Sequence, residues 1–321
     1  MKFFLFRSAL VAAAVMLVPS GPQRCSADAL ALDGPNRLPT VSQEAVNQGV
    51  VPQPYPPAPA PLFESGDDVP DWTWQAMPEG LIWRSYLAGV HEPRFGLVTS
   101  HTRSFGTTWD ATLGGRVAMV RYGTNTAYRP EGWELDLEGA AMPRLQPLEE
   151  SSPVVSTDFR VGVPVTYGSG PWQFKTGYYH LSAHLGDEFM LLNPSAVRIN
   201  YTRDAVMLAV GYFYTDALRL FGEYDYAFVL GGGSKPGQFQ FGVDYSPAIR
   251  GGAPFAAVYT NLLEELDYGG SFVAQAGWQF RGGMALHTFR LGVEYVNGAN
   301  TQYEFFNTFE QRVGFGIWYD Y

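Results

Sequence analysis

The stretch GYYHLSAHLGDEF, residues 177–189, holds two of the five histidines in this 321-residue chain, together with one serine and two acids. His180 and Ser182 are separated by one residue, and on an extended strand such a pair lies on one face. An imidazole beside a hydroxyl can act as general base and nucleophile in acyl transfer when a third group orients the imidazole. Asn193 is the expected orienting residue, because it shares parity with the apolar residues of the strand that follows, and Glu188 is the alternative. Serine hydrolysis is therefore one of three interpretations of this stretch.

The second interpretation is a metal site, and the third is structural. An imidazole and two carboxylates are available from His184, Asp187 and Glu188. Calcium is the ion that would suit these ligands best, in a role that bridges lipopolysaccharide phosphates. Neighbours in one loop form a site only if the fold gathers them. Structurally, imidazoles and hydroxyls anchor proteins at the headgroup level of a membrane, and the Gly-Asp pair suits a turn. From the residues alone we favour the structural interpretation.

The segments around this stretch alternate apolar and polar side chains with a period of two, which predicts β-strands. In WELDLEGAA, residues 133–141, Trp133, Leu135 and Leu137 share one parity and the acids share the other. Such runs are about ten residues long, whereas strands of a soluble sandwich are usually near five or six. The closing RVGFGIWYDY alternates in the same way and ends on an aromatic residue. It resembles the carboxy-terminal assembly signal of outer-membrane β-barrel proteins.

A barrel with both ends in the periplasm has an even number of strands. Reading residues 197–214 as one strand with a bulge near Arg203 and Asp204 gives about twelve, with short connections on one side and long ones on the other, as expected for such barrels. We therefore predict an all-β fold, an antiparallel transmembrane β-barrel of about twelve strands over residues 80–321. Inward charged side chains should largely fill its lumen, so that any pore is small. They are Arg160, Lys175, Arg219, Glu223, Asp225 and Glu294.

The amino-terminal part has a different composition. Residues 1–29 combine early basic residues, a short apolar run and small residues, which is typical of a secretory signal peptide and predicts export to the bacterial outer membrane. Residues 30–79 are rich in proline, and we expect a disordered tether there. The one cysteine, Cys25, excludes disulfides within the chain and a thiol-based site in the barrel. The net charge of −10 leaves no basic surface for nucleic acid.

Two resemblances add to these inferences. The His180-Leu181-Ser182 pattern resembles that of two outer-membrane hydrolase families, phospholipase A and lipid A deacylase, which implies that His180 is a general base and Ser182 a nucleophile facing the outer leaflet. Those families usually continue with Asn-Gly or Asn-Ala after the serine, whereas this chain has Ala183-His184. YHLSAHLGDEF and the upstream WRSYLAGVHEPRFG resemble the bacterial family catalogued as domain of unknown function 1207, over roughly residues 80–321. That family implies no activity.

Three functions follow as hypotheses. The first is an outer-membrane barrel with a structural or narrow-channel role. The second is an outer-leaflet lipid hydrolase that uses an outward-facing His/Ser pair. The third is a secreted soluble β-sandwich or a lipocalin-like binding protein, which strand length and the terminal segment disfavour. Outer-membrane lipid is the expected partner, and no oligomeric state follows from the sequence.

Overall fold

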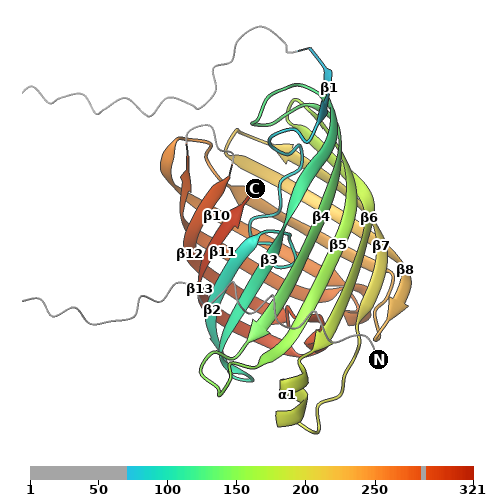
Figure 1. Cartoon of the computed structure of the whole chain (residues 1–321), viewed down its shortest axis with the longest axis vertical. Coiled ribbons are helices and arrows are strands. Elements are labelled where there is room, and N and C mark those ends of the chain that lie inside the picture. Colours follow the sequence, from blue (N-terminus) through green and yellow to red (C-terminus); the bar gives the residue numbers. More distant parts are fainter. Residues whose placement is uncertain (1–70, 283–286) are drawn as a thin grey trace, which may run out of the picture. The chain divides into compact units, whose positions relative to one another are not determined.

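Long alternating strands close into a barrel in this computed structural model, which describes residues 71–282 and 287–321. The strands of the ring are β2 (Phe95–Thr102), β3 (Gly106–Gly123), β4 (Gly132–Leu145), β5 (Val154–Ser169), β6 (Trp172–Leu185), β7 (Thr202–Phe213), β8 (Leu218–Gly231), β9 (Gly237–Tyr245), β10 (Gly251–Leu263), β11 (Gly269–Arg281), β12 (Thr288–Ala299) and β13 (Phe309–Asp320). Each pairs antiparallel with its sequence neighbours, and β13 also pairs with β2 (Figure 1). Closure removes the free sheet edges. The predicted twelve-stranded antiparallel barrel is confirmed.

The two ends of the barrel differ. The carboxy terminus and the tight β5–β6 turn lie at one end, which we call the short-turn end; α1 (Asp187–Leu192) lies at the other, the loop end (Figure 1). Two 3-10 turns, η2 (Glu264–Leu266) and η3 (Tyr303–Phe305), also lie in loop-end connections. Within the described ranges no helix is long and apolar enough to cross a membrane.

One short strand lies outside the ring. β1 (Thr73–Ala76) pairs with the short-turn end of β3. The sheet therefore begins a few residues before the boundary expected at residue 80. The predicted signal peptide, Cys25 and most of the proline-rich tether lie outside the described residues.

The barrel wall is apolar outside and polar inside. Along β6 the outward Trp172, Phe174 and Tyr178 are exposed, whereas Gln173 and Lys175 point inward and are buried. The six charged residues predicted to fill the lumen are all buried. This pattern suits a wall that meets lipid, and it is the reverse of a water-soluble barrel or sandwich, whose interior is apolar. The soluble alternative is therefore wrong.

Residues 77–94, between β1 and β2, run through the lumen. The Tyr86 ring is buried and stacks on Phe221 with ring centroids 3.8 Å apart. The backbone N–H of Ile82 donates to Glu134 Oε1 at 2.9 Å, and the Tyr86 hydroxyl donates to Glu223. Residues 77–94, at the start of the predicted barrel domain, thus form an internal plug.

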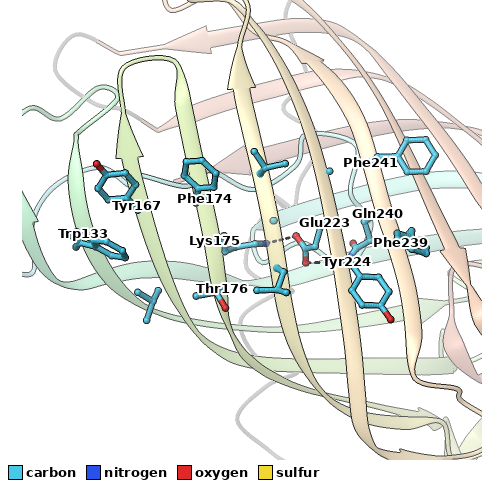
Figure 2. Close-up of a pocket in the computed structure, with 15 residues that line it drawn as sticks. Trp133, Tyr167, Phe174, Lys175, Thr176, Glu223, Tyr224, Phe239, Gln240 and Phe241 are labelled. Atoms are coloured by element: carbon cyan, nitrogen blue, oxygen red, sulfur yellow. Dashed lines mark hydrogen bonds and ion pairs between the residues drawn. The ribbon is translucent and has the colours of Figure 1, made fainter.

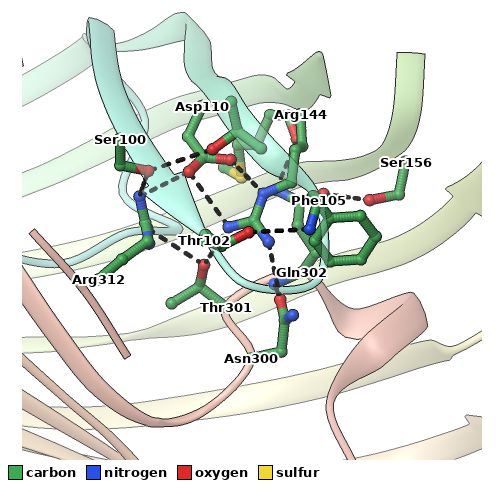
Figure 3. A network of polar contacts seen from close by, with 12 residues as sticks. Ser100, Thr102, Phe105, Asp110, Arg144, Ser156, Asn300, Thr301, Gln302 and Arg312 are labelled. Atoms are coloured by element: carbon green, nitrogen blue, oxygen red, sulfur yellow. Dashed lines mark hydrogen bonds and ion pairs between the residues drawn. The ribbon is translucent and has the colours of Figure 1, made fainter. Parts of the chain in front are cut away.

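The loop between β12 and β13 fills the lumen from the loop end. The Arg144 guanidinium lies 2.8 Å from Glu310. It also donates to Asn300 at 3.2 Å, and Arg312 donates to Asp110 at 2.6 Å (Figure 3). Such multiply bonded guanidinium groups compensate for the loss of hydration of buried charge. Both ends of the lumen are therefore occupied by the chain itself.

Candidate functional site at the loop end of β6 and β7

Strand β6 presents His180, Ser182 and His184 on its outward face. The His180 side chain is 39% exposed, and Ser182 is half-buried. Across the β6–β7 ladder His180 stands opposite Asp204, and Ser182 stands opposite Thr202. The outward placement agrees with the alternation in the sequence.

The imidazole of His180 is held by a carboxylate. Its Nδ1 lies 2.6 Å from Asp204 Oδ1, and the Tyr178 hydroxyl donates to the same oxygen at 2.9 Å. An Nδ1–H that donates to a carboxylate leaves the lone pair on Nε2, which is the tautomer a general base needs. Two donors on one oxygen also fix the direction of the Asp204 side chain.

Ser182 lies one pleat beyond His180. Residues two apart on a strand have Cα atoms about 6.7 Å apart, and side chains that lean along the strand can bridge that separation. No residue of the described chain makes a hydrogen bond with the Ser182 hydroxyl. Catalytic hydrogen bonds often tighten only when substrate binds. The outward face therefore carries an imidazole held by a carboxylate, with a serine hydroxyl two residues further along the same strand.

Asp204 was not among the residues expected to orient the imidazole. Asn193 was the expected residue, but it ends α1 and its Nδ2 donates to the Phe189 carbonyl at 2.9 Å. Glu188, the alternative, lies exposed in the first turn of α1. One feature of the sequence could have pointed to Asp204. A bulge was expected near Arg203 and Asp204, and the β7–β8 register does shift between Asp204 and Ala205. The strand itself begins only at Thr202 and not at residue 197, as was expected.

The predicted calcium ligands are not gathered. His184 points outward, with its ring 5.9 Å from that of Phe159, while Asp187 and Glu188 begin α1. Among residues 71–282 and 287–321, no three His, Cys, Asp or Glu side chains are arranged to hold a metal ion. These residues do not fit a resident calcium ion, so no chemistry at this site is derived through one.

The surroundings of the pair are apolar. Val161 stands opposite His180 and Phe159 opposite Ser182 on β5, and both side chains are exposed. On β7, Val206 is exposed below Asp204. These polar side chains therefore lie in an otherwise apolar part of the outward face.

Residues 73–321 match the family described as "Protein of unknown function (DUF1207)". This chain belongs to the DUF1207 family. The match begins at β1 and ends at the carboxy terminus, so it covers the whole sheet of this DUF1207 protein. No curated protein sequence matches significantly.

Solved structures with similar folds share little sequence with this DUF1207 protein. Outer membrane phospholipase A from Escherichia coli has 14% identity and a TM-score of 0.47, covering 71% of this chain and 90% of that one. The calcium-bound phospholipase dimer from Salmonella typhi has 14% identity and a TM-score of 0.47, covering 71% and 91%. The KdgM porin has 12% identity and a TM-score of 0.40, covering 71% and 98%. No residue role carries over at these similarities.

Proposed function

We propose that this protein is an outer-membrane serine hydrolase that cleaves acyl esters of outer-leaflet lipids. The observation that supports it is the 2.6 Å contact between His180 Nδ1 and Asp204 Oδ1, on the same outward face as Ser182. Nucleophile, base and orienting acid are the three parts that acyl transfer needs, and they are recognised by geometry rather than by order in the chain.

The chemistry follows from these roles. The Ser182 hydroxyl attacks the ester carbonyl carbon while His180 Nε2 takes its proton, and Asp204 stabilises the imidazolium. The imidazolium then returns the proton to the leaving alcohol as the acyl–oxygen bond breaks. Water, activated by the same imidazole, releases the fatty acid from Ser182.

The height of the site supports a substrate at the outer headgroup boundary. Ser182 is ten residues beyond Trp172, the first residue of β6, which is about 33 Å along the strand. With a strand tilt near 40°, this is about 25 Å along the membrane normal, the usual height of the apolar band of such barrels. We place the short-turn end in the periplasm because barrels of this class keep short turns there. Lipid esters lie at the opposite boundary, level with Ser182.

The test is fatty-acid release by the refolded protein from phospholipid and from lipopolysaccharide, with and without calcium. We expect release from at least one lipid, loss of release in Ser182→Ala, and labelling of Ser182 by a fluorophosphonate. Ser169→Ala is the matched control, because Ser169 is exposed at the short-turn end of the same wall. If neither lipid releases fatty acid, the hydrolase proposal fails and a structural role remains. The filled lumen favours that structural role over a channel role.

A further inference from the structure

The outward wall contains a groove of about 880 Å³ that crosses β4 to β9 (Figure 2). Aromatic side chains stand on both sides of it: Trp133, Tyr167 and Phe174 on one, Tyr224, Phe239 and Phe241 on the other. The floor between them is β7 and β8. Its volume falls within the range of small-ligand sites, about 300–1,000 Å³.

The groove exists because one outward position has no side chain. The register aligns Phe174, Val210, Gly222 and Phe241 in one row across four strands. A Cβ at Gly222 would meet no atom within 4 Å, and the backbone there is not in the left-handed region. Nothing in the backbone requires this glycine. A glycine inside a strand marks a bulge, a tight bend of a barrel, or a close approach by a ligand or another backbone, and the register of β8 shows no bulge at Gly222.

The walls select an apolar ligand. The two charged residues that line the groove, Lys175 on β6 and Glu223 on β8, point into the lumen and pair with each other at 2.7 Å. The groove therefore offers aromatic and aliphatic surface without a facing charge. Such a surface fits a hydrocarbon chain and not a headgroup.

The depth of the groove in the membrane determines which leaflet supplies the acyl chain. Phe174 is eight residues below Ser182, about 26 Å along the strand at about 3.3 Å per residue, or about 20 Å along the membrane normal at a strand tilt near 40°. One leaflet is only half of the roughly 30 Å hydrocarbon core. An acyl chain whose ester lies at Ser182 therefore does not reach this groove. The groove faces the periplasmic leaflet, whose lipids are phospholipids.

We propose that this groove is a binding site for an acyl chain of a phospholipid from the periplasmic leaflet, seated over Gly222. The site is separate from the proposed hydrolysis and does not depend on it. The phospholipid headgroup would lie near Trp172, in the aromatic layer at the short-turn end.

The test compares three proteins purified from membranes in mild detergent: wild type, Gly222→Trp and Ala276→Trp. Ala276 is a small, exposed, outward residue on β11, outside the groove, and serves as the matched control. Native mass spectrometry with lipid extraction should find about one phospholipid per chain in wild type and in Ala276→Trp, and at least tenfold lower occupancy in Gly222→Trp. Gly222→Leu, a smaller filler, replaces Gly222→Trp if the latter loses heat-modifiable gel mobility.

Four outcomes would overturn the proposal. The first is no retained phospholipid in wild type, and the second is retention of lipopolysaccharide instead. The third is equal loss in the Gly222 and Ala276 variants. The fourth is a dimer that Gly222→Trp dissociates, because the occupant would then be a second copy of the chain. Fatty-acid release is measured on the same samples and reports on Ser182 separately.

Discussion

His180 and Asp204 face each other across the β6–β7 ladder, with Nδ1 2.6 Å from Oδ1, on the lipid side of the wall. A second pair, His91 and Asp158, has a similar distance of 2.9 Å but is buried in the lumen, where the Tyr303 N–H also donates to Asp158. Both pairs join an imidazole to a carboxylate. Only the first of these two pairs lies on the outward face of the barrel.

Asp204→Ala, His180→Ala and Ser182→Ala are each expected to lower kcat for fatty-acid release by about 10²–10⁴-fold. The three groups act as one unit, so the triple variant should be no worse than Ser182→Ala alone. Steady-state kinetics in mixed micelles measure this, with heat-modifiable gel mobility as the check on folding. Wild-type rates in Asp204→Ala would remove Asp204 from the mechanism.

Tyr178→Phe should lower kcat about 3- to 10-fold with KM unchanged. It removes one neutral donor from Asp204 Oδ1, a hydrogen bond of about 1 kcal/mol, while leaving the His180 contact. Tyr226→Phe is the control, since Tyr226 is an exposed outward tyrosine on β8. A larger loss in the control, or a change confined to KM, would argue against a positioning role for Tyr178.

Lys175→Met is expected to lower the free energy of unfolding by about 3–5 kcal/mol, because it leaves the buried Glu223 carboxylate without its cation. The double variant Lys175→Met/Glu223→Leu should recover most of that loss, since no buried charge is then unpaired. Urea unfolding of the refolded barrel measures both. Lys235→Met, at an exposed loop position, should stay within about 0.5 kcal/mol of wild type.

Two variants replace either residues 77–94 or residues 300–308 by a Gly/Ser linker of equal length. Each single replacement should leave the conductance in planar bilayers low. Replacing both should produce open-channel currents, because the two segments together fill one lumen. Large currents from the wild-type protein would contradict a filled lumen and revive the narrow-channel role.

The alternation of side chains along the sequence was enough to predict the barrel wall. A period of two assigns each side chain to one face, so alternation predicted the long strands, the buried charges such as Lys175 and the outward His180 and Ser182. An even strand number and the alternation of short and long connections then predicted twelve strands in a closed ring. These are local properties, and they need no knowledge of which residues meet across strands.

Which residues become neighbours across strands was settled by the folded barrel and not by local sequence. Residues 186–201 join β6 to β7, and a connection of that length leaves the register between the strands open. The choice of Asp204 over Asn193 as the partner of His180 therefore depended on the ladder and its bulge. The plug formed by residues 77–94 has no period of its own, and its place was decided by lumen side chains such as Glu134 and Glu223. The empty space over Gly222 likewise arises only when β6 to β9 are aligned, because a groove is a property of neighbouring strands and not of any one of them.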